Sequence, residues 1–168
     1  MARDKLDTGK FEDQIIKLEE EGKTVMVLAE GKTILGLIAV ADTLKDSAKE
    51  GVKALRDKKI EVVMITGDNK RAAEAIAKEA GIERVLAEVL PSDKESEVRK
   101  IQAEGKIVAM VGDGINDAPA LATANIGIAM GTGTDIAIES GDIVLTHGNL
   151  SGVVSSIKLS RATFRKIK

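Results

Sequence analysis

Two aspartates, four residues apart, are the side chains of this chain best suited to chemistry. Asp113 and Asp117 lie on a stretch with glycine at positions 112 and 114, directly after the apolar run 107–111. Glycine lets the backbone bend sharply, and carboxylates are the hard oxygen ligands that magnesium prefers, together with water and phosphate oxygens. The spacing therefore predicts a magnesium site on this turn. A turn aspartate followed by a helix-capping aspartate is the structural alternative.

Two other polar groups could contact a phosphate. Thr66 and Gly67 offer a hydroxyl and unhindered backbone amides, which together can hold a phosphoryl oxygen, and Asp68 could bind a ribose or a water molecule. Lys94 lies near the first turn of an expected helix, where a cation is unfavourable unless a bound anion offsets the cost. A helix N-cap for the Thr66 group and a solvated position for Lys94 are the structural alternatives.

Apolar strands that alternate with amphipathic helices position these groups. The expected strands are 60–65, 84–89, 106–111, 126–130 and 143–145, and the expected helices are 46–58, 70–80, 92–103, 117–124 and 149–167. This alternation predicts right-handed βαβ units and a parallel sheet with helices on both faces, an α/β fold. Ligands of such sheets bind at the carboxyl ends of the strands, so the groups around Thr66, Lys94 and Asp113 are expected at one rim.

The first 41 residues follow a different pattern. Apolar residues at helical spacing predict a helix over 10–21, ended by Gly22. Two apolar runs, 24–29 and 33–40, are joined by a short polar turn and predict an antiparallel hairpin.

Composition excludes several classes of protein. The 168 residues are 43% hydrophobic and 31% charged, which is typical of an ordinary soluble globular domain. With a net charge of -2, the chain has no excess of positive charge with which to bind nucleic acid, so no nucleic-acid partner is expected. The longest apolar run, 34–41, is far too short for a membrane helix. The lone His147 is expected at the surface, without a metal.

Five motifs occur in a fixed order along nearly the whole chain. They are Asp42-Thr43-Leu44-Lys45, Thr66-Gly67-Asp68-Asn69, Pro91-Ser92-Asp93-Lys94, Gly112-Asp113-Gly114-Ile115-Asn116-Asp117-Ala118-Pro119-Ala120-Leu121 and Gly131-Thr132-Gly133-Thr134-Asp135. In this order and spacing the chain resembles the P-type ion-pumping ATPases, most closely the heavy-metal branch and its copper pumps. One such motif would be weak evidence, whereas five in register make chance similarity improbable.

The resemblance implies a fold and a division into domains. Residues 42–160 would be most of the phosphorylation domain, with the haloacid-dehalogenase-like, Rossmann-like fold. Residues 1–41 would be a remnant of the nucleotide-binding domain, and 42–45 the hinge between the two. Residues 161–168 would form a basic helix that leads towards a membrane segment in the intact pump.

The resemblance also implies an activity, the ATP-driven transport of a heavy-metal cation, with copper as the first candidate. In the intact pump this part of the chain would lie at the cytoplasmic face of a cell membrane. Mg²⁺ and ATP would be the cofactors. Asp113 would coordinate magnesium with support from Asp117, and Lys94 would neutralise the aspartyl phosphate, so Lys94 and Asp113 are the implied catalytic residues. The other implied contacts, to the phosphoryl group, the nucleotide and magnesium, are Thr66, Gly67, Asp68 and Asn116. The loop 131–134 is expected to be structural.

One part of the family pattern is missing. The nucleophilic aspartate of these pumps lies in an Asp-Lys-Thr-Gly-Thr motif after the central strand, and no such motif occurs here. The echo at 4–9 follows only three residues, which cannot form a buried strand. The chain alone is therefore expected not to form the aspartyl phosphate. Without the central strand, its neighbours would expose backbone edges.

Three structural outcomes would leave no strand edge exposed: folding with another fragment, strand exchange in a homo-oligomer, or a rearranged sheet. The expected partners are accordingly the remainder of the pump, including its nucleophile strand, nucleotide-binding, actuator and membrane domains. Two other functions stay open. One is a stand-alone phosphatase of the same superfamily with Asp4 or Asp7 as nucleophile, and the other is a non-catalytic module that binds nucleotide and magnesium.

Overall fold

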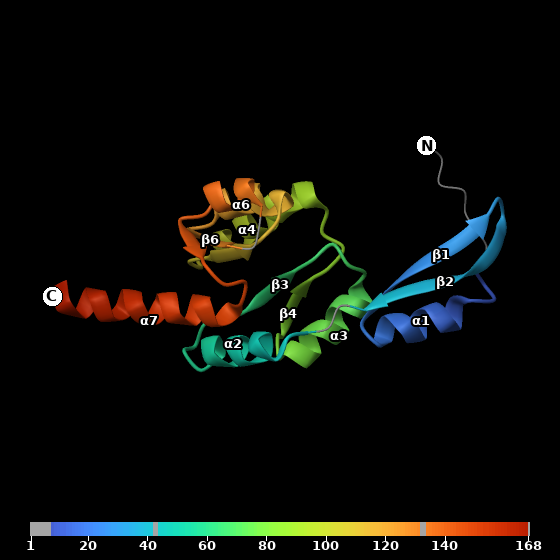
Figure 1. Cartoon of the computed structure of the whole chain (residues 1–168), viewed down its shortest axis with the longest axis horizontal. Helices are drawn as coiled ribbons and strands as arrows, with labels where there is room; N and C mark the ends of the chain where they lie inside the picture. Colours follow the sequence, from blue (N-terminus) through green and yellow to red (C-terminus); the bar gives the residue numbers. More distant parts are fainter. Residues whose placement is uncertain (1–7, 42–43, 132–133, 168) are drawn as a thin grey trace.

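The computed structural model describes residues 8–41, 44–131 and 134–167. Its amino-terminal part consists of a helix, α1 (Glu12–Glu20), and two antiparallel strands, β1 (Lys23–Glu30) and β2 (Thr33–Ala41). They form the arm at the right of Figure 1, with α1 packed against β1. Side chains of β1 alternate between half-buried and exposed, since only one face of the hairpin is covered. The predicted helix and antiparallel hairpin are confirmed.

The rest of the chain alternates between helices and strands. In order, its elements are α2 (Asp46–Arg56), β3 (Val63–Ile65), α3 (Lys70–Ala80), β4 (Arg84–Leu86), η1 (Pro91–Asp93), α4 (Lys94–Ala103), β5 (Ala109–Gly112), η2 (Ile115–Asp117), α5 (Ala118–Thr123), β6 (Ile126–Met130), α6 (Asp135–Glu139), β7 (Ile143–Leu145) and α7 (Leu150–Ile167). All pairings among β3 to β7 are parallel, so the predicted α/β class is confirmed. In Figure 1, α2 lies below β3, α6 lies above β6, and α7 extends to the left.

The parallel strands form two separate sheets. One has the order β3-β4 and the other β5-β6-β7, and no ladder joins β3 to β5 within the described ranges. Strand β6, which is paired on both sides, buries Ile128 and Ala129 to 3% and 0% exposure, whereas every residue of β3 is only partly buried. Both β3 and β5 therefore have an edge without a strand partner in the part of the chain that the structure describes.

Several strands are shorter than the apolar runs that predicted them. The run 60–65 yields a strand only from Val63, and the run 106–111 yields a ladder only from Ala109. A ladder needs a partner, and each of these runs has a partner strand on one side only. The five-residue helix α6 was not predicted because so short a segment carries no helical period.

Helices α2 and α7 pack together on one side of the strands and build a core with β6 and β7. Its buried members are Leu55, Ile128, Leu145, Val153 and Val154. The two helices approach closely at Gly51, where an added Cβ would lie 2.6 Å from the Cβ of Leu150. Among residues 8–41, 44–131 and 134–167, no helix has both the length and the apolarity to cross a membrane.

Candidate functional site

The turn after β5 places the two aspartates in different environments. Asp113 is exposed, whereas Asp117, at the end of η2, retains only 8% of its surface exposed. The glycine before the turn is required by close approach, since a Cβ on Gly112 would lie 2.7 Å from the Cβ of Asp117. The strand end and the buried carboxylate are therefore packed directly against each other.

Lys94 and Asp117 form an ion pair at this turn. The Lys94 Nζ donates to Asp117 Oδ1 at 2.6 Å, and both side chains are largely buried. The Gly114 N–H donates to Asp117 Oδ2 at 3.2 Å, so both carboxylate oxygens accept hydrogen bonds. The sequence predicts that a bound anion would offset the unfavourable position of Lys94 at the amino end of α4, whereas in the structure a carboxylate of the same chain, Asp117, partners it.

The Thr66 turn is held by its own hydrogen bonds and by the loop after β4. The Thr66 hydroxyl donates to Asp68 Oδ2 at 2.7 Å. The backbone N–H groups of Val89 and Glu88 donate to the carbonyls of Thr66 and Asp68. The cap of α3 is Asn69, whose side chain accepts from the Ala72 N–H at 2.9 Å. Thr66 and Asp68 are therefore not needed as the helix cap, which was the structural alternative for them.

The predicted site residues share one end of the strands but fall into two groups. Lys94, Asp113, Asn116 and Asp117 lie around the turn after β5, and η1 contacts η2 there. The Thr66, Gly67 and Asp68 group follows β3, on the other sheet. The loop after β4, whose Glu88 and Val89 N–H groups donate to the Thr66 turn, leads through η1 to Lys94. Asn116 is exposed and Gly67 has room for a Cβ, 3.5 Å from the Val89 carbonyl oxygen.

The carboxylates alone do not make a complete metal site. No group of three or more His, Asp or Glu side chains in the described ranges is placed to hold a metal ion. Asp113 offers an exposed carboxylate on the turn, while its backbone carbonyl accepts from the Thr134 N–H at 3.0 Å. A cation here would need further oxygen ligands from a phosphate, from water or from another segment.

Some sequence predictions lie outside the described residues. These are the nucleophile alternatives Asp4 and Asp7, the hinge residues Asp42 and Thr43, and the loop residues Thr132 and Gly133. Sequence reasoning placed Lys94 and Asp117 at one rim but did not predict their ion pair, because the residues are 23 positions apart. The sequence also predicts that Gly112 lets the backbone bend. In the structure, glycine is needed at this position because Asp117 occupies the space that a Cβ would fill.

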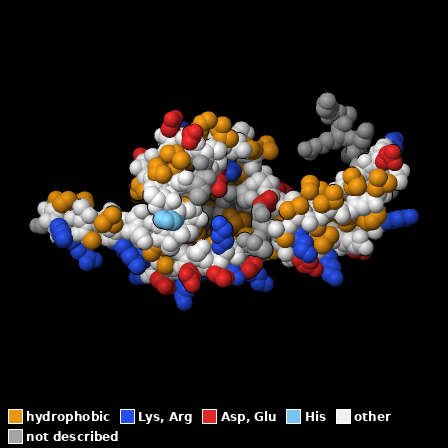
Figure 2. Space-filling view, in the orientation of Figure 1, with side chains coloured by type: hydrophobic (Ala, Val, Ile, Leu, Met, Phe, Trp, Pro, Cys, Tyr) orange, Lys and Arg blue, Asp and Glu red, His pale blue; other side chains and the backbone are white. Residues whose placement is uncertain are grey.

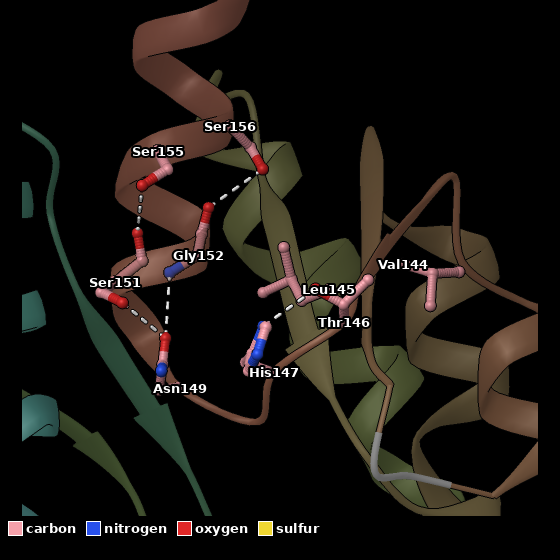
Figure 3. A pocket seen from close by; sticks show the side chains of 9 residues that line it. All are labelled: Val144, Leu145, Thr146, His147, Asn149, Ser151, Gly152, Ser155 and Ser156. Atoms are coloured by element: carbon pink, nitrogen blue, oxygen red, sulfur yellow. Dashed lines mark hydrogen bonds between the residues drawn. The ribbon is translucent and has the colours of Figure 1, made fainter.

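A pocket of about 380 Å³ lies elsewhere, between the end of β7 and the start of α7 (Figure 3). Its hydroxyls are already used within the chain: Ser151 donates to Asn149 Oδ1 at 2.6 Å, and Ser155 and Ser156 donate to backbone carbonyls one turn earlier. The exposed His147 lies beside Thr146, 3.0 Å from its hydroxyl. One wall of this pocket is the amino-terminal cap of α7, in which the Gly152 N–H donates to Asn149 Oδ1 at 3.2 Å.

Comparison with known proteins relates the whole chain to larger proteins. It is 52% identical over 168 residues to a copper-exporting P-type ATPase of Bacillus subtilis (strain 168), covering 100% of this chain and 21% of that protein. It is 51% identical over 170 residues to a probable copper-importing P-type ATPase A of Enterococcus hirae, covering 100% of this chain and 23% of that protein. The chain thus spans about a fifth of the length of these curated relatives.

Solved structures agree with the sequence comparison. A zinc-transporting PIB-type ATPase in the E2.Pi state matches with a TM-score of 0.79 and 45% identity, over 97% of this chain and 27% of that one. The catalytic domain of the CPx-ATPase CopB-B matches with a TM-score of 0.62 and 29% identity, over 74% of this chain and 48% of that one. The family model of the haloacid dehalogenase-like hydrolases matches residues 1–125. The chain belongs to the haloacid dehalogenase-like hydrolases, and within them it corresponds to a segment of the heavy-metal P-type ATPases.

Proposed function

We propose that this chain is the catalytic cytoplasmic portion of an ATP-driven transporter of a heavy-metal cation, with copper as the first candidate for the cargo. The observation that carries the proposal is the Lys94–Asp117 pair beside the glycine turn, at the carboxyl end of the strands. The two curated relatives named above are a copper-exporting and a probable copper-importing pump, so the direction of transport stays open. The zinc-transporting ATPase among the solved structures makes zinc the second candidate for the cargo.

The residues of the turn fit a magnesium ion and a phosphoryl group in different ways. Asp113, which is exposed and forms no ion pair with the residues that the structure describes, would supply the carboxylate ligand. Asp117 would support the site by accepting hydrogen bonds from Lys94 and from the Gly114 amide. Magnesium, bound there with ATP, would neutralise charge on the transferred phosphoryl group. Lys94 would do the same from the protein side, since a fixed ammonium in a partly dry site is effective where charge develops.

The Thr66 turn would contact the phosphoryl group from the opposite side. The Gly67 amide is suited to a phosphate oxygen. The Thr66 hydroxyl donates to Asp68 Oδ2 in this structure and would turn away from Asp68 to donate to a phosphate oxygen. Asn116, exposed on the other turn, would donate its side-chain amide to the phosphate. Phosphoryl transfer needs chiefly this positioning and charge stabilisation from the protein.

The gap between β3 and β5 is where a nucleophile would enter. A strand that ran parallel to both would pair with their two open edges and bring its last residues between the Thr66 turn and the Asp113 turn. We assign this place to the Asp-Lys-Thr-Gly-Thr segment of a longer protein. The present chain would then supply magnesium and phosphate contacts without forming the aspartyl phosphate itself.

Phosphorylation from radiolabelled ATP tests this function. The chain alone should incorporate no label, and co-expression with a segment that carries a strand and Asp-Lys-Thr-Gly-Thr should restore it in the presence of Mg²⁺. In the restored protein, Lys94→Ala should lower the phosphorylation rate by about 10²- to 10³-fold, the usual cost of losing one charge-stabilising donor. Label in the chain alone, or p-nitrophenyl phosphate turnover abolished by Asp7→Asn, would instead favour a stand-alone phosphatase.

The metal role is tested separately from turnover. Mn²⁺ can stand in for Mg²⁺ and its binding is followed by water proton relaxation. Asp113→Asn should weaken binding, because it removes the exposed carboxylate without touching the Lys94 pair. Nucleotide binding that depends on magnesium, without phosphorylation of the complemented protein, would identify the non-catalytic module.

A further inference from the structure

A residue with a left-handed backbone lies in the loop after β4. Glu88 has a φ of 57°, which is unfavourable for a residue that carries a Cβ. Among the described residues, Lys59 is the other non-glycine residue with a positive φ. The side chain of Glu88 is exposed and forms no hydrogen bond or ion pair with the described part of the chain. The strain at Glu88 therefore has its reason in the backbone.

The left-handed conformation lets two successive amides donate to the same turn. The Glu88 N–H donates to the Asp68 carbonyl at 2.9 Å, and the Val89 N–H donates to the Thr66 carbonyl at 3.0 Å. In an extended segment, successive N–H groups point to opposite sides, whereas a left-handed residue can turn both to one side. Because φ and ψ of Glu88 set the angle between these two peptide groups, an extended residue 88 would move one amide away from the turn.

One amide of the Thr66 turn is left for a ligand. The Thr66 N–H donates to the Leu86 carbonyl at 2.9 Å, and the Asp68 N–H donates to the Thr66 hydroxyl at 3.2 Å. The Gly67 N–H has no acceptor among the residues that the structure describes, and Gly67 is exposed. The carbonyls on either side of Gly67 are those that the loop after β4 holds, so this loop sets the direction of the Gly67 amide.

The same loop continues to the other half of the site. It passes through η1 to Lys94, whose Nζ lies 2.6 Å from Asp117 Oδ1. Figure 2 shows the surface hollowed between the part of the molecule that holds β6 and α6 and the part that holds α2 and α3. Residues 88–94 thus connect the Thr66 turn on one sheet to the lysine beside the other sheet, and the backbone of Glu88 fixes the first end of this connection.

We propose that Glu88 is a positioning residue whose left-handed backbone points the Gly67 amide at a phosphate oxygen, and that its carboxylate takes no part. This inference rests on the proposed function, which assigns the Thr66 turn to the phosphoryl group. Glycine adopts such a φ without strain and should serve as well as glutamate at position 88. A β-branched residue is disfavoured at positive φ and should not.

NMR titration of the isotope-labelled chain with inorganic phosphate and Mg²⁺ tests the proposal through the Gly67 amide signal. The signal should shift with the same concentration dependence in the unmodified chain, in Glu88→Gly and in Glu88→Gln. Glu88→Val should need at least about tenfold more phosphate, the usual worth of one hydrogen bond to a charged group.

The matched control is Lys59→Val, which places the same side chain at a φ of 61° before the amino end of β3. Both positions are exposed, so both valine variants carry a similar backbone penalty and should lower the melting temperature alike. Lys59→Val should leave the phosphate dependence unchanged, because it lies at the opposite end of β3 from the Thr66 turn.

Hydrogen exchange in the unmodified chain is a second test that needs no variant. Exchange should be slow at Glu88 and Val89 and fast at Gly67, and phosphate should slow it at Gly67. The proposal is overturned by a Gly67 signal that phosphate does not shift, by an equal weakening in Glu88→Gly or Glu88→Gln, or by an equal weakening in Lys59→Val. Phosphate binding that depends on Glu88 in this way, in a chain that takes up no label from ATP after complementation, would refute the proposed phosphoryl transfer alone.

Discussion

Asp117 carries the negative charge that balances the ammonium group of Lys94. Its carboxylate is the counter-ion of the largely buried Lys94 and accepts a hydrogen bond from Gly114. Asp117→Asn would leave the ammonium without its partner, and breaking one side of such a pair is strongly destabilising. We expect a loss of about 2 to 4 kcal/mol in the free energy of unfolding, measured by urea titration.

The neighbouring aspartate is the control for that measurement. Asp113→Asn removes the same charge from an exposed carboxylate in the same turn, so its effect should stay within about 0.5 kcal/mol. Equal losses in the two variants would contradict a special role for the ion pair. A double-mutant cycle with Lys94→Met would then measure the coupling directly.

Gly112 is a second residue whose replacement has a defined consequence. A Cβ there would overlap the side chain of Asp117, so Gly112→Ala must displace the buried carboxylate or the strand end. Overpacking of this kind costs roughly 1 to 3 kcal/mol. Gly36→Ala on β2 is the control, because nothing lies within 4 Å of an added Cβ there. Thermal unfolding of the two variants compares them, and equal melting temperatures would refute the overlap.

A cluster of four charged side chains joins the two sheets at the amino ends of their strands. Glu61 precedes β3 and Arg84 begins β4, while Glu104 and Lys106 precede β5. Arg84 donates to Glu104 at 2.6 and 2.9 Å, and Lys106 contacts both Glu61 and Glu104. We call these residues the amino-end cluster. It spans the gap that lacks a strand.

The amino-end cluster predicts an acid-dependent contribution to stability. Hydrogen bonds from Arg84, and after it from Lys106, lower the pKa of Glu104 from its ordinary value of 4.5 to about 2. An acid with a depressed pKa stabilises the fold fully above its unfolded pKa, and that contribution is lost as the pH falls from 4.5 to about 2. NMR titration should give Glu104 a midpoint near 2. Arg84→Gln should raise that midpoint, whereas Arg99→Gln, which removes an ion pair within α4, should not.

The sequence predicted the helices and the hairpin better than the strands. Helical period and polar turns are local, so α2, α3 and α4 were found within a few residues. Strand length depends on partners that lie elsewhere, and runs such as 60–65 therefore exceed the ladders they form. The rim that gathers Thr66, Lys94 and Asp113 followed from topology. The pairing of Lys94 with Asp117 did not, because it depends on how α4 approaches the turn.

At the scale of the whole molecule, the edge of β3 that has no strand partner among the described residues leaves a pattern in the backbone amides. The Thr66 N–H donates to the Leu86 carbonyl on β4, so the alternate amides of Val63 and Ile65 point towards the gap. Hydrogen exchange should be fast at Val63 and Ile65 and slow at Met64 and Thr66. In β6, which is paired on both sides, neighbouring amides should be protected alike. Uniform protection along β3 would mean that its open edge is covered in solution.

The two ends of the gap are secured in different ways. At the carboxyl end, the continuous backbone of residues 87–93 crosses from β4 towards Lys94. At the amino end, the exposed charges of the amino-end cluster join the sheets, and Ile60 and Val62 pack against the core that β6, β7 and α7 build. Salt screens exposed charges and leaves covalent bonds untouched. Raising the ionic strength should therefore weaken the contacts of the amino-end cluster, while the apolar packing of Ile60 and Val62 keeps the two sheets together. Spin labels at Lys59 and Ala103, which are exposed and lie outside the amino-end cluster, should then show a broader distribution of distances at high salt with little change in the mean distance.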